Sequence, residues 1–220
     1  MPPTQDEALF TVMKKELFSA ILGDVLDQMG FRSQFLPAAV RPMRPDIVLA
    51  GRAMPAVHAP GIASDGGRFG KMLQALDSMR PGEVYVIDGD GAPYALWGEL
   101  MSTRARRLGA AGAVMNGFHR DSNGILALHF PTFSRGAYAQ DVNGRGYVAD
   151  FRVTIRIAGV EVVPGDVIFG DLDGVLVIPA AVAEEVVQKA LQKVRGEDQV
   201  RRAFAEGISA VEAFERYQVM

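Results

Sequence analysis

The sequence predicts an α/β fold with helices added at both ends. Three observations support it: a strand, a helix and a strand in succession between residues 84 and 115, several short strands in the second half, and helical apolar spacing near both termini. With 220 residues, 49% of them apolar, the chain can build one sizeable core. We expect a single domain over the whole chain, divided into an N-terminal helix (1–30), an α/β core (31–179) and C-terminal helices (180–220).

Composition excludes several classes of protein. The net charge is −3, which does not favour a nucleic-acid or anionic-membrane partner. The absence of cysteine excludes disulfides, zinc–thiolate sites and thiol catalysis. The first seven residues lack the basic and apolar segments of a signal peptide, and no apolar run reaches the ~18 residues that span a bilayer. We therefore expect a cytoplasmic protein.

The first thirty residues predict one long helix. Apolar residues recur between Asp6 and Met29 at the spacing of a helix face, and Gly30 ends the pattern as a C-cap glycine would. Three further segments follow in order: strand residues 47–49 and 53–54 separated by Gly51, a glycine-rich loop at 60–67, and a helix at 72–76 closed by Pro81 and Gly82.

The centre of the chain predicts a pair of parallel strands. Val84–Asp88 is a short β-rich segment, residues 99–108 have a helical pattern that Gly109 closes, and Ala113–Met115 is a buried-strand candidate before the turn at Asn116–Gly117. A strand, a helix and a strand joined by short connections are typical of a βαβ unit.

The second half changes to short strands and ends in helices. Phe151–Ile157 alternates apolar and polar residues, as a half-buried strand does. Glycine-containing turns separate further strands up to Val175–Ile178, so we expect a β-meander packed beside the βαβ unit. Pro179 introduces a helix from about 181 to 194, and a second helix is predicted over 197–217.

The start of the predicted helix at Glu99 is a candidate anion site. Gly98 precedes it, and the N–H groups of a first helical turn have no partner within the helix. The amides of Leu100 and Met101 are therefore candidates to hold a substrate carboxylate or a developing enolate oxygen. The alternative is that Glu99 only complements the helix dipole, which contributes about 0.3–1 kcal/mol.

Arg120 and Asp121 form the second part of this candidate site. Twenty residues separate them from Glu99, and they follow the predicted strand Ala113–Met115, where ligand sites of parallel sheets gather. Arginine offers a planar pair of donors to a carboxylate, and aspartate offers a hard oxygen ligand to Mg²⁺ or Mn²⁺. Taken alone, the pair would be a surface ion pair of negligible energy. Its combination with the helix start favours a site.

These motifs resemble the RraA-like family, whose enzymes include 4-hydroxy-4-methyl-2-oxoglutarate aldolase and 4-carboxy-4-hydroxy-2-oxoadipate aldolase. The motifs are Gly98–Met101, the twenty-residue gap and Arg120–Asp121. The resemblance covers most of the chain and implies a layered α/β/β/α sandwich with a mixed sheet. Four further segments take part in it: residues 23–27, 80–84, 164–166 and 173–175.

The resemblance implies a divalent-metal-dependent class II aldolase. Such an enzyme cleaves a 4-hydroxy-2-oxo acid to pyruvate through an enolate and often also decarboxylates oxaloacetate. By position, Asp121 corresponds to the direct ligand of Mg²⁺ or Mn²⁺, Glu99 to a ligand acting through water, and Arg120 to the group that binds the oxo-acid end and steadies a catalytic water. Residues Gly98–Met101 correspond to the substrate loop. The resemblance further implies a homotrimer or homohexamer with sites at subunit interfaces, where Glu197 of a neighbouring copy could enter the site.

Two positions depart from the family pattern and leave the substrate's identity open. Asn116 stands where many members have aspartate, and His119 where a small residue is common. His119 has a ring suited to moving protons near neutral pH, but we favour a partly exposed loop residue. His58 and His129 are too widely spaced to suggest a histidine metal site with it, so we interpret them as structural.

Three alternative functions make different demands on the sequence. A non-catalytic RraA-type regulator that binds a ribonuclease would need neither Glu99 nor Asp121. A methyltransferase acting on menaquinone precursors lacks support, since no glycine-rich cofactor loop of the expected type is visible. A Schiff-base aldolase needs a desolvated lysine, and none follows a buried strand. The lysines are Lys14, Lys15, Lys71, Lys189 and Lys193.

Overall fold

The computed structural model describes residues 4–63 and 67–218. Its strands are β1 (Arg41–Pro42), β2 (Leu49–Pro60), β3 (Glu83–Asp88), β4 (Ala95–Trp97), β5 (Gly112–Asn116), β6 (Phe118–His119), β7 (Thr132–Ser134), β8 (Gly146–Phe151), β9 (Ile155–Ile157), β10 (Val160–Val162), β11 (Val167–Asp171) and β12 (Gly174–Ile178). Its helices are α1 (Gln5–Glu16), α2 (Ser19–Gln28), α3 (Met72–Asp77), α4 (Glu99–Arg107), α5 (Ser122–Ala127), the short 3₁₀ helix η1 (Ala180–Val182), α6 (Ala183–Ala205) and α7 (Ala210–Tyr217).

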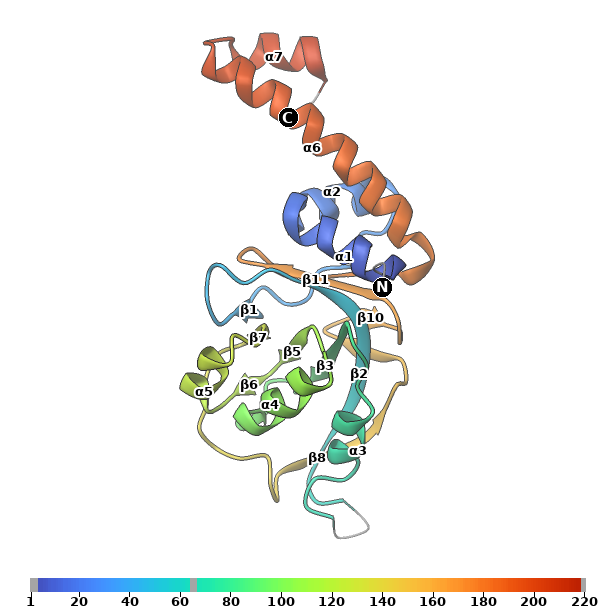
Figure 1. Cartoon of the computed structure of the whole chain (residues 1–220), viewed down its shortest axis with the longest axis vertical. Coiled ribbons are helices and arrows are strands. Elements are labelled where there is room, and N and C mark those ends of the chain that lie inside the picture. Colours follow the sequence, from blue (N-terminus) through green and yellow to red (C-terminus); the bar gives the residue numbers. More distant parts are fainter. Residues whose placement is uncertain (1–3, 64–66, 219–220) are drawn as a thin grey trace.

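A mixed sheet in the order β1-β7-β5-β3-β2-β11-β12 forms the centre of the body, and β8 also pairs with β2 (Figure 1). Neighbouring strands from β2 to β7 run parallel, so the predicted βαβ unit of β3, α4 and β5 is confirmed. Alternate residues of β3 serve different layers. Tyr85 and Ile87 face the cluster that includes residues of α3, α4 and α5, whereas Val84 and Val86 pack with the β9–β10 hairpin. Burial on both faces explains why β3 and β5 are apolar almost throughout.

The N-terminal segment forms two helices, so the prediction of one continuous helix is wrong. Leu17 and Phe18 are extended between α1 and α2. The break lets the backbone N–H and the hydroxyl of Ser19 both donate to the Asp171 carboxylate, each over 2.7 Å. Apolar spacing continues across the break, because both helices pack in one cluster with β11, β12 and α6. The apolar pattern therefore indicated which face of the segment is buried, but not that the chain changes direction between α1 and α2.

The late strands do not form a meander of their own, so that prediction is also wrong. β8 and β11 both pair antiparallel with the long strand β2, at its two ends, whereas β9 and β10 form a separate two-stranded sheet. The expected strand Phe151–Ile157 is interrupted, since β8 ends at Phe151 and Arg152 has a φ of 56°. A positive φ is costly for a residue with a side chain, so surrounding contacts must hold Arg152 there.

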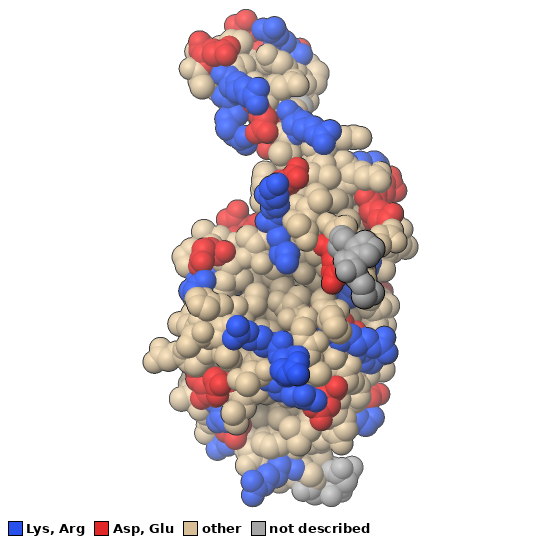
Figure 2. All heavy atoms as spheres, viewed as in Figure 1, with Lys and Arg blue, Asp and Glu red and all other residues tan. Residues whose placement is uncertain are grey.

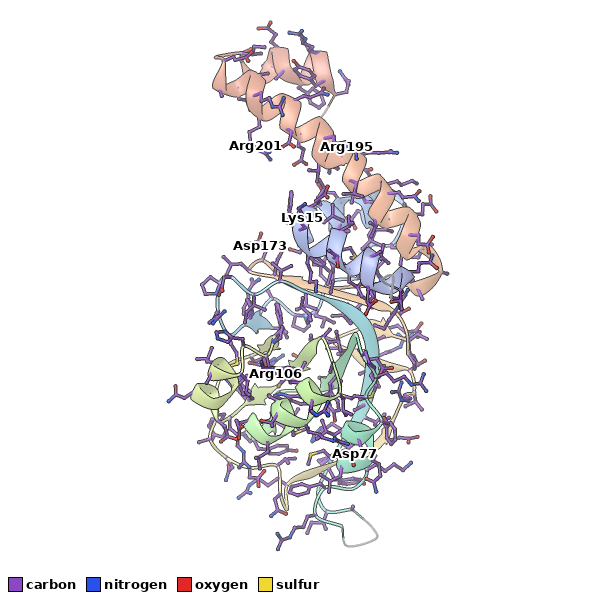
Figure 3. All side chains as sticks on the ribbon, viewed as in Figure 1. Lys15, Asp77, Arg106, Asp173, Arg195 and Arg201 are labelled. Atoms are coloured by element: carbon purple, nitrogen blue, oxygen red, sulfur yellow. The ribbon has the colours of Figure 1, made fainter. Side chains whose placement is uncertain are left out.

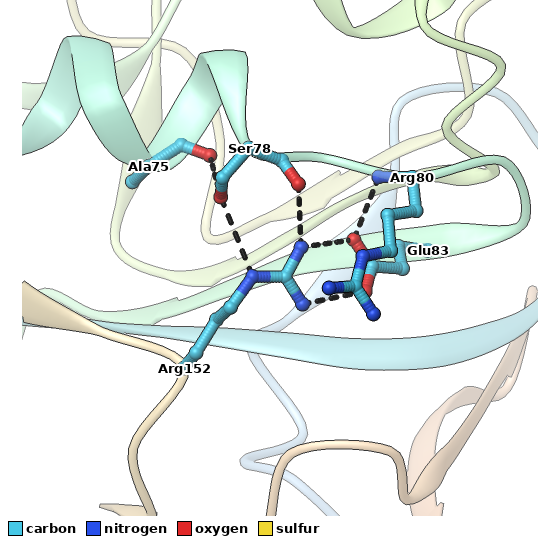
Figure 4. Close-up of polar contacts among 5 residues, drawn as sticks. All are labelled: Ala75, Ser78, Arg80, Glu83 and Arg152. Carbon is cyan, nitrogen blue, oxygen red and sulfur yellow. Dashed lines mark hydrogen bonds and ion pairs between the residues drawn. The ribbon is translucent and has the colours of Figure 1, made fainter.

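Arg152 is held by a bidentate ion pair with Glu83 (Figure 4). Its two terminal nitrogens donate to the two Glu83 carboxylate oxygens over 2.7 and 2.8 Å, and one of them also donates to the Ser78 carbonyl over 2.6 Å. Glu83 also accepts from the backbone N–H of Arg80. Because these residues lie at the end of β8, the start of β3 and the segment after α3, the pair joins three elements.

Two predicted boundaries also shift. β2 is one strand rather than two, and Gly51 lies inside it. Close packing requires glycine at this position, because a Cβ would approach the Gly82 carbonyl oxygen to 2.5 Å. In the C-terminal region, α6 continues through Gly196 and ends before Gly207, whose φ is 93°. The predicted break near residue 195 is therefore wrong. The predicted loop at 60–67 includes residues 64–66, which lie outside the described residues.

The C-terminal helices form an arm. α6 begins against α1 and α2, then extends beyond the body and is followed by α7 (Figure 1). Basic and acidic side chains are interspersed over the body and the arm on the face shown in Figure 2. None of the helices within the described ranges is long and apolar enough to cross a membrane.

Replacement of Arg152 by methionine should destabilise the fold. The substitution leaves the largely buried Glu83 carboxylate without its bidentate partner, so we expect the free energy of unfolding in urea to fall by about 3 kcal/mol. Arg156→Met is the matched control, because Arg156 is exposed and pairs with the exposed Glu161. That change should cost about 0.5 kcal/mol or less. Equal losses for the two variants would contradict the proposed joining role.

Candidate active site

Two short parallel strands bring the sequence-predicted residues together. β4 leads into α4 through Gly98, and β6 leads into α5 through Arg120 and Asp121. β4 and β6 pair in parallel, and the backbone N–H of Arg120 donates to the Trp97 carbonyl over 2.9 Å. Parallel strands end at the same edge, so both helix starts meet there. Sequence patterns predicted the helix that begins at Glu99 and the Arg120–Asp121 pair, but neither β4 nor β6.

Asp121 lies against the start of α4. Its carboxylate accepts a hydrogen bond from the backbone N–H of Glu99 over 3.3 Å, while Gly98 supplies no side-chain cap. The first-turn amides of Leu100 and Met101 have no carbonyl partner within the helix. A ligand anion at this point would therefore meet unpaired N–H groups and the positive end of the helix dipole.

Gly98 permits this close approach. A Cβ at position 98 would lie 2.7 Å from an Asp121 carboxylate oxygen, well inside contact distance. The φ of Gly98 is −151°, which any residue adopts, so space and not conformation requires glycine here. Asp121 itself has a φ of 57°. That left-handed conformation turns the chain from β6 into α5 and is better tolerated by aspartate than by most residues.

Arg120 lies between two carboxylates. Its Nε is 3.7 Å from an Asp121 oxygen and its Nη1 is 3.6 Å from an Asp141 oxygen. Both distances exceed those of direct hydrogen bonds, so the guanidinium keeps donors for a ligand. Sequence reasoning missed Asp141, which lies in no helix or strand and no motif. Only the tertiary structure places it, through the hydrogen bond from the Ala95 N–H to the Gln140 carbonyl.

The carboxylate of Glu99 turns away from this group. It accepts from the Thr103 hydroxyl over 2.8 Å, one turn along α4, and its side chain packs against Gly124 of α5. Glu99 therefore contributes its backbone N–H to the Asp121 contact, and its carboxylate lies outside the lining of the cavity described below.

A cavity of about 330 Å³ opens beside these residues. Gly98, Leu100, Met101, Arg120, Asp121 and Asp141 line it. Apolar residues of α3 and of other segments complete the lining: Phe69, Met72, Leu73, Leu76, Ala95, Leu96, Trp97 and Val142. The volume lies within the usual range for small-molecule sites.

A buried hydrogen-bond chain fixes the helix start. The Trp97 indole N–H donates to the Ser102 hydroxyl over 2.7 Å, and that hydroxyl donates to the Gly98 carbonyl over 3.0 Å. The indole ring also packs against Tyr85, with 5.0 Å between ring centroids. Because the indole N–H, the Ser102 hydroxyl and the Gly98 carbonyl are buried and paired with one another, the position of Gly98 is held from behind.

His119 is buried, so the expectation of a partly exposed loop residue is wrong. Its ring nitrogens lie 2.7 Å from the Ser134 hydroxyl and 3.0 Å from the Ser122 hydroxyl, and burial lowers the pKa of the ring. The pairing of β6 with β4 explains the difference, since it draws residue 119 into the body. Asn116 is also buried, bonded to Asp88 and Arg135, and neither residue lines the cavity.

The donor set fits an ion that retains much of its water. Within residues 4–63 and 67–218, no cluster of three or more histidine, aspartate and glutamate side chains could hold a metal ion by itself. Mg²⁺ usually binds through one or two carboxylates, with water and substrate oxygens completing its ligands. Asp121 is partly exposed and lines the cavity, so it can supply one such carboxylate. The described residues do not offer a site in which protein ligands alone surround the ion.

The model of the RraA-like family, described as aldolase/RraA, matches residues 19–177. The chain belongs to the RraA-like family. It is 38% identical over 144 residues to the Halalkalibacterium halodurans protein named "Putative 4-hydroxy-4-methyl-2-oxoglutarate aldolase". This match covers 65% of this chain and 68% of that protein. It is 32% identical over 200 residues to protein DlpA of Legionella pneumophila, covering 90% of this chain. The match covers 32% of DlpA, so the chain spans about a third of that relative's length.

A solved structure supports the RraA-like fold over almost the whole chain. The crystal structure of an uncharacterized protein from Pseudomonas syringae superposes with a TM-score of 0.88 at 27% sequence identity, and covers 99% of this chain and 96% of that one. The expected mixed α/β fold with helices at both ends is thereby confirmed.

Replacement of Gly98 by alanine should reveal the contact with Asp121. The new methyl group must displace the carboxylate, so we expect the free energy of unfolding to fall by about 1 kcal/mol. The same change in an Asp121→Ala background should cost almost nothing, because the displaced group is gone. Urea unfolding of the two single variants and the double variant measures this coupling. An equal cost in both backgrounds would show that the methyl group collides with something else.

Proposed function

We propose that this RraA-like chain is a divalent-metal-dependent class II aldolase that cleaves a 4-hydroxy-2-oxo acid to pyruvate through an enolate, and that it also decarboxylates oxaloacetate. The observation that carries the proposal is that Arg120, Asp121 and the first turn of α4 meet at a single cavity. The name of the Halalkalibacterium halodurans relative supports an aldolase reaction. The divalent cation, the 4-hydroxy-2-oxo acid substrate and the decarboxylation are proposed in addition.

In this proposal Arg120 binds the oxo-acid end of the substrate. Its spare donors match a carboxylate, and the neighbouring Asp121 and Asp141 carboxylates favour this position of the guanidinium in the cavity lining. The amides of Leu100 and Met101 stabilise negative charge that develops on the 2-oxo group as the bond breaks. A water held by Arg120 accepts the proton of the C4 hydroxyl, and a proton returns to C3 of pyruvate.

Asp121 would hold Mg²⁺ or Mn²⁺ directly, and Glu99 would reach it through water. One Asp121 oxygen is oriented by the Glu99 N–H, which leaves the other for the ion. A bound cation would supply Lewis-acid polarisation of the 2-oxo group. Loss of carbon dioxide from oxaloacetate develops negative charge on the same atoms, so the same residues would serve both reactions.

We also propose a homotrimer or homohexamer with sites at subunit interfaces. Glu197 lies on α6, close to Arg195, which Figure 3 labels on the arm that extends away from Arg106 of α4. This position on the arm supports a role for Glu197 in the site of another copy rather than in its own. No lysine lines the cavity among the described residues, and Lys71 is paired with Asp150, which argues against a Schiff-base mechanism.

The change Asp121→Asn should abolish cation binding and pyruvate release together. Loss of a supporting residue around a metal lowers affinity 10–100-fold, so loss of a direct ligand should cost at least about a hundredfold. Binding of Mn²⁺, followed by electron paramagnetic resonance, measures affinity without turnover, and lactate dehydrogenase with NADH measures pyruvate. Asp173→Asn is the control, because Asp173 is exposed and lies far from α3 and α4, as its label in Figure 3 shows.

Removal of the cation provides the complementary measurement. Excess chelator should stop pyruvate release from 4-hydroxy-2-oxo acids and from oxaloacetate, and added Mg²⁺ should restore both. Activity that survives chelation, or that is unchanged in Asp121→Asn, would contradict the proposed mechanism. Absence of activity on every 2-oxo acid in the presence of Mg²⁺ would favour the alternative, a non-catalytic RraA-type regulator that binds a ribonuclease.

A further inference from the structure

Asp141 is an ionisable side chain of the cavity lining that takes no step in the proposed reaction. Among the described residues of that lining, the ionisable side chains are Arg120, Asp121 and Asp141. In the proposed function Arg120 binds the oxo-acid end of the substrate and Asp121 holds the cation. The carboxylate of Asp141 is therefore available for the step that remains, which is removal of the proton from the C4 hydroxyl.

Backbone hydrogen bonds hold Asp141 beside β4 and β6. The Ala95 N–H of β4 donates to the Gln140 carbonyl over 2.8 Å, and Asp141 forms a parallel bridge with Ala95. Earlier in the same segment, the Tyr138 N–H donates to the His119 carbonyl of β6 over 2.8 Å. The segment is thus attached to both strands that lead into the site, which fixes the backbone at Asp141 relative to it.

The carboxylate of Asp141 has room to accept a proton. Among the described residues it accepts no direct hydrogen bond, and the Nη1 of Arg120, its ion-pair partner, is 3.6 Å away. At this separation the two groups can share one ligand atom, such as the oxygen of the water that Arg120 is proposed to hold. The side chain is 35% exposed, so solvent can carry the proton away afterwards.

Other titratable groups near the site are less suited to this step. The Glu99 carboxylate accepts from the Thr103 hydroxyl and lies outside the cavity lining. His119 is buried, hydrogen-bonded to two serine hydroxyls, and also outside the lining. Within the described lining of this chain, Asp141 is the carboxylate that is not assigned to the cation. Glu197 of another copy is the competing acceptor, since it is proposed to enter the site.

We infer that Asp141 accepts the proton of the substrate's C4 hydroxyl through the water that Arg120 holds. The inference rests on the proposed function and names the acceptor that the cleavage step needs, because water alone is a weak base. As the C3–C4 bond breaks, its electron pair passes to C3. The electrons of the O–H bond form the C4 carbonyl, and the proton reaches Asp141 through the water. C3 then takes a proton from solvent and Asp141 releases one to solvent, so neither oxidant nor reductant is needed.

Decarboxylation of oxaloacetate provides an internal comparison, because that reaction removes carbon dioxide from an ionised carboxylate and takes no proton from a hydroxyl. In Asp141→Asn, kcat/KM for cleavage of 4-hydroxy-4-methyl-2-oxoglutarate should fall at least about a hundredfold, which is the size of a general-base contribution. Decarboxylation by the same variant should fall far less, and its affinity for Mn²⁺, followed by electron paramagnetic resonance, should be unchanged.

The outcomes separate this inference from the proposed function. Equal losses of both reactions, or loss of Mn²⁺ binding, would overturn the role of Asp141 and leave the proposed aldolase standing. A wild-type chain that acts on neither acid would contradict the proposed function itself. Asp46→Asn is the matched control and should leave the ratio of the two reactions unchanged, because Asp46 also pairs with an arginine, Arg44 over 2.8 Å, and does not line the cavity.

Chemical rescue distinguishes proton transfer from positioning. In Asp141→Ala, added formate should restore part of the cleavage activity, because formate can accept a proton in the space that the side chain leaves. Chloride at equal ionic strength should not restore it. Absence of any recovery specific to formate would overturn the inference. So would a fall in the ratio of cleavage to decarboxylation in Glu197→Gln but not in Asp141→Asn, since that result would identify the neighbouring copy as the source of the acceptor.

Discussion

The contact between the Asp121 carboxylate and the backbone at Gly98 and Glu99 organises the candidate site. It requires two short strands to end side by side, a residue without a side chain on one of them, and a left-handed turn on the other. Two of these requirements cost free energy of folding. Asp121 adopts a φ of 57°, which is unfavourable for a residue with a side chain, and glycine at position 98 loses more backbone entropy on folding than another residue would. The hydrogen bonds of Trp97 and Ser102 hold Gly98 in place from behind.

The α3 residues that line the cavity depend on further contacts. α3 has only six residues, too few to be stable without tertiary support. Its support comes from β8 at one end and from the pair of Arg152 and Glu83 at the other. Arg152 contacts Glu83 and Ser78 and does not itself line the cavity. An ion pair between Arg104 and Asp77 also joins α4 to α3, so the elements that line the cavity are connected.

Local patterns predicted the parts of this molecule that depend on neighbours in sequence. The βαβ unit and the helix start after Gly98 follow from period, propensity and capping chemistry, which a short window contains. The failures share a different cause. The break at Phe18 depends on Asp171, and the interruption at Arg152 depends on Glu83. Asp141 reaches Arg120 only through the folded chain. Such partners lie too far apart in sequence for any local pattern to reveal.

The geometry of Asp121 explains how one residue can serve both structure and chemistry. The Glu99 N–H orients one of its oxygens, so the side chain does not rotate freely toward Arg120, 3.7 Å away. A carboxylate fixed in this way presents its second oxygen in one direction, which is what a weakly chelated, hydrated ion requires. Orientation through a backbone amide is also independent of side-chain identity at position 99. Glu99 therefore orients Asp121 through its backbone N–H while its carboxylate accepts from the Thr103 hydroxyl.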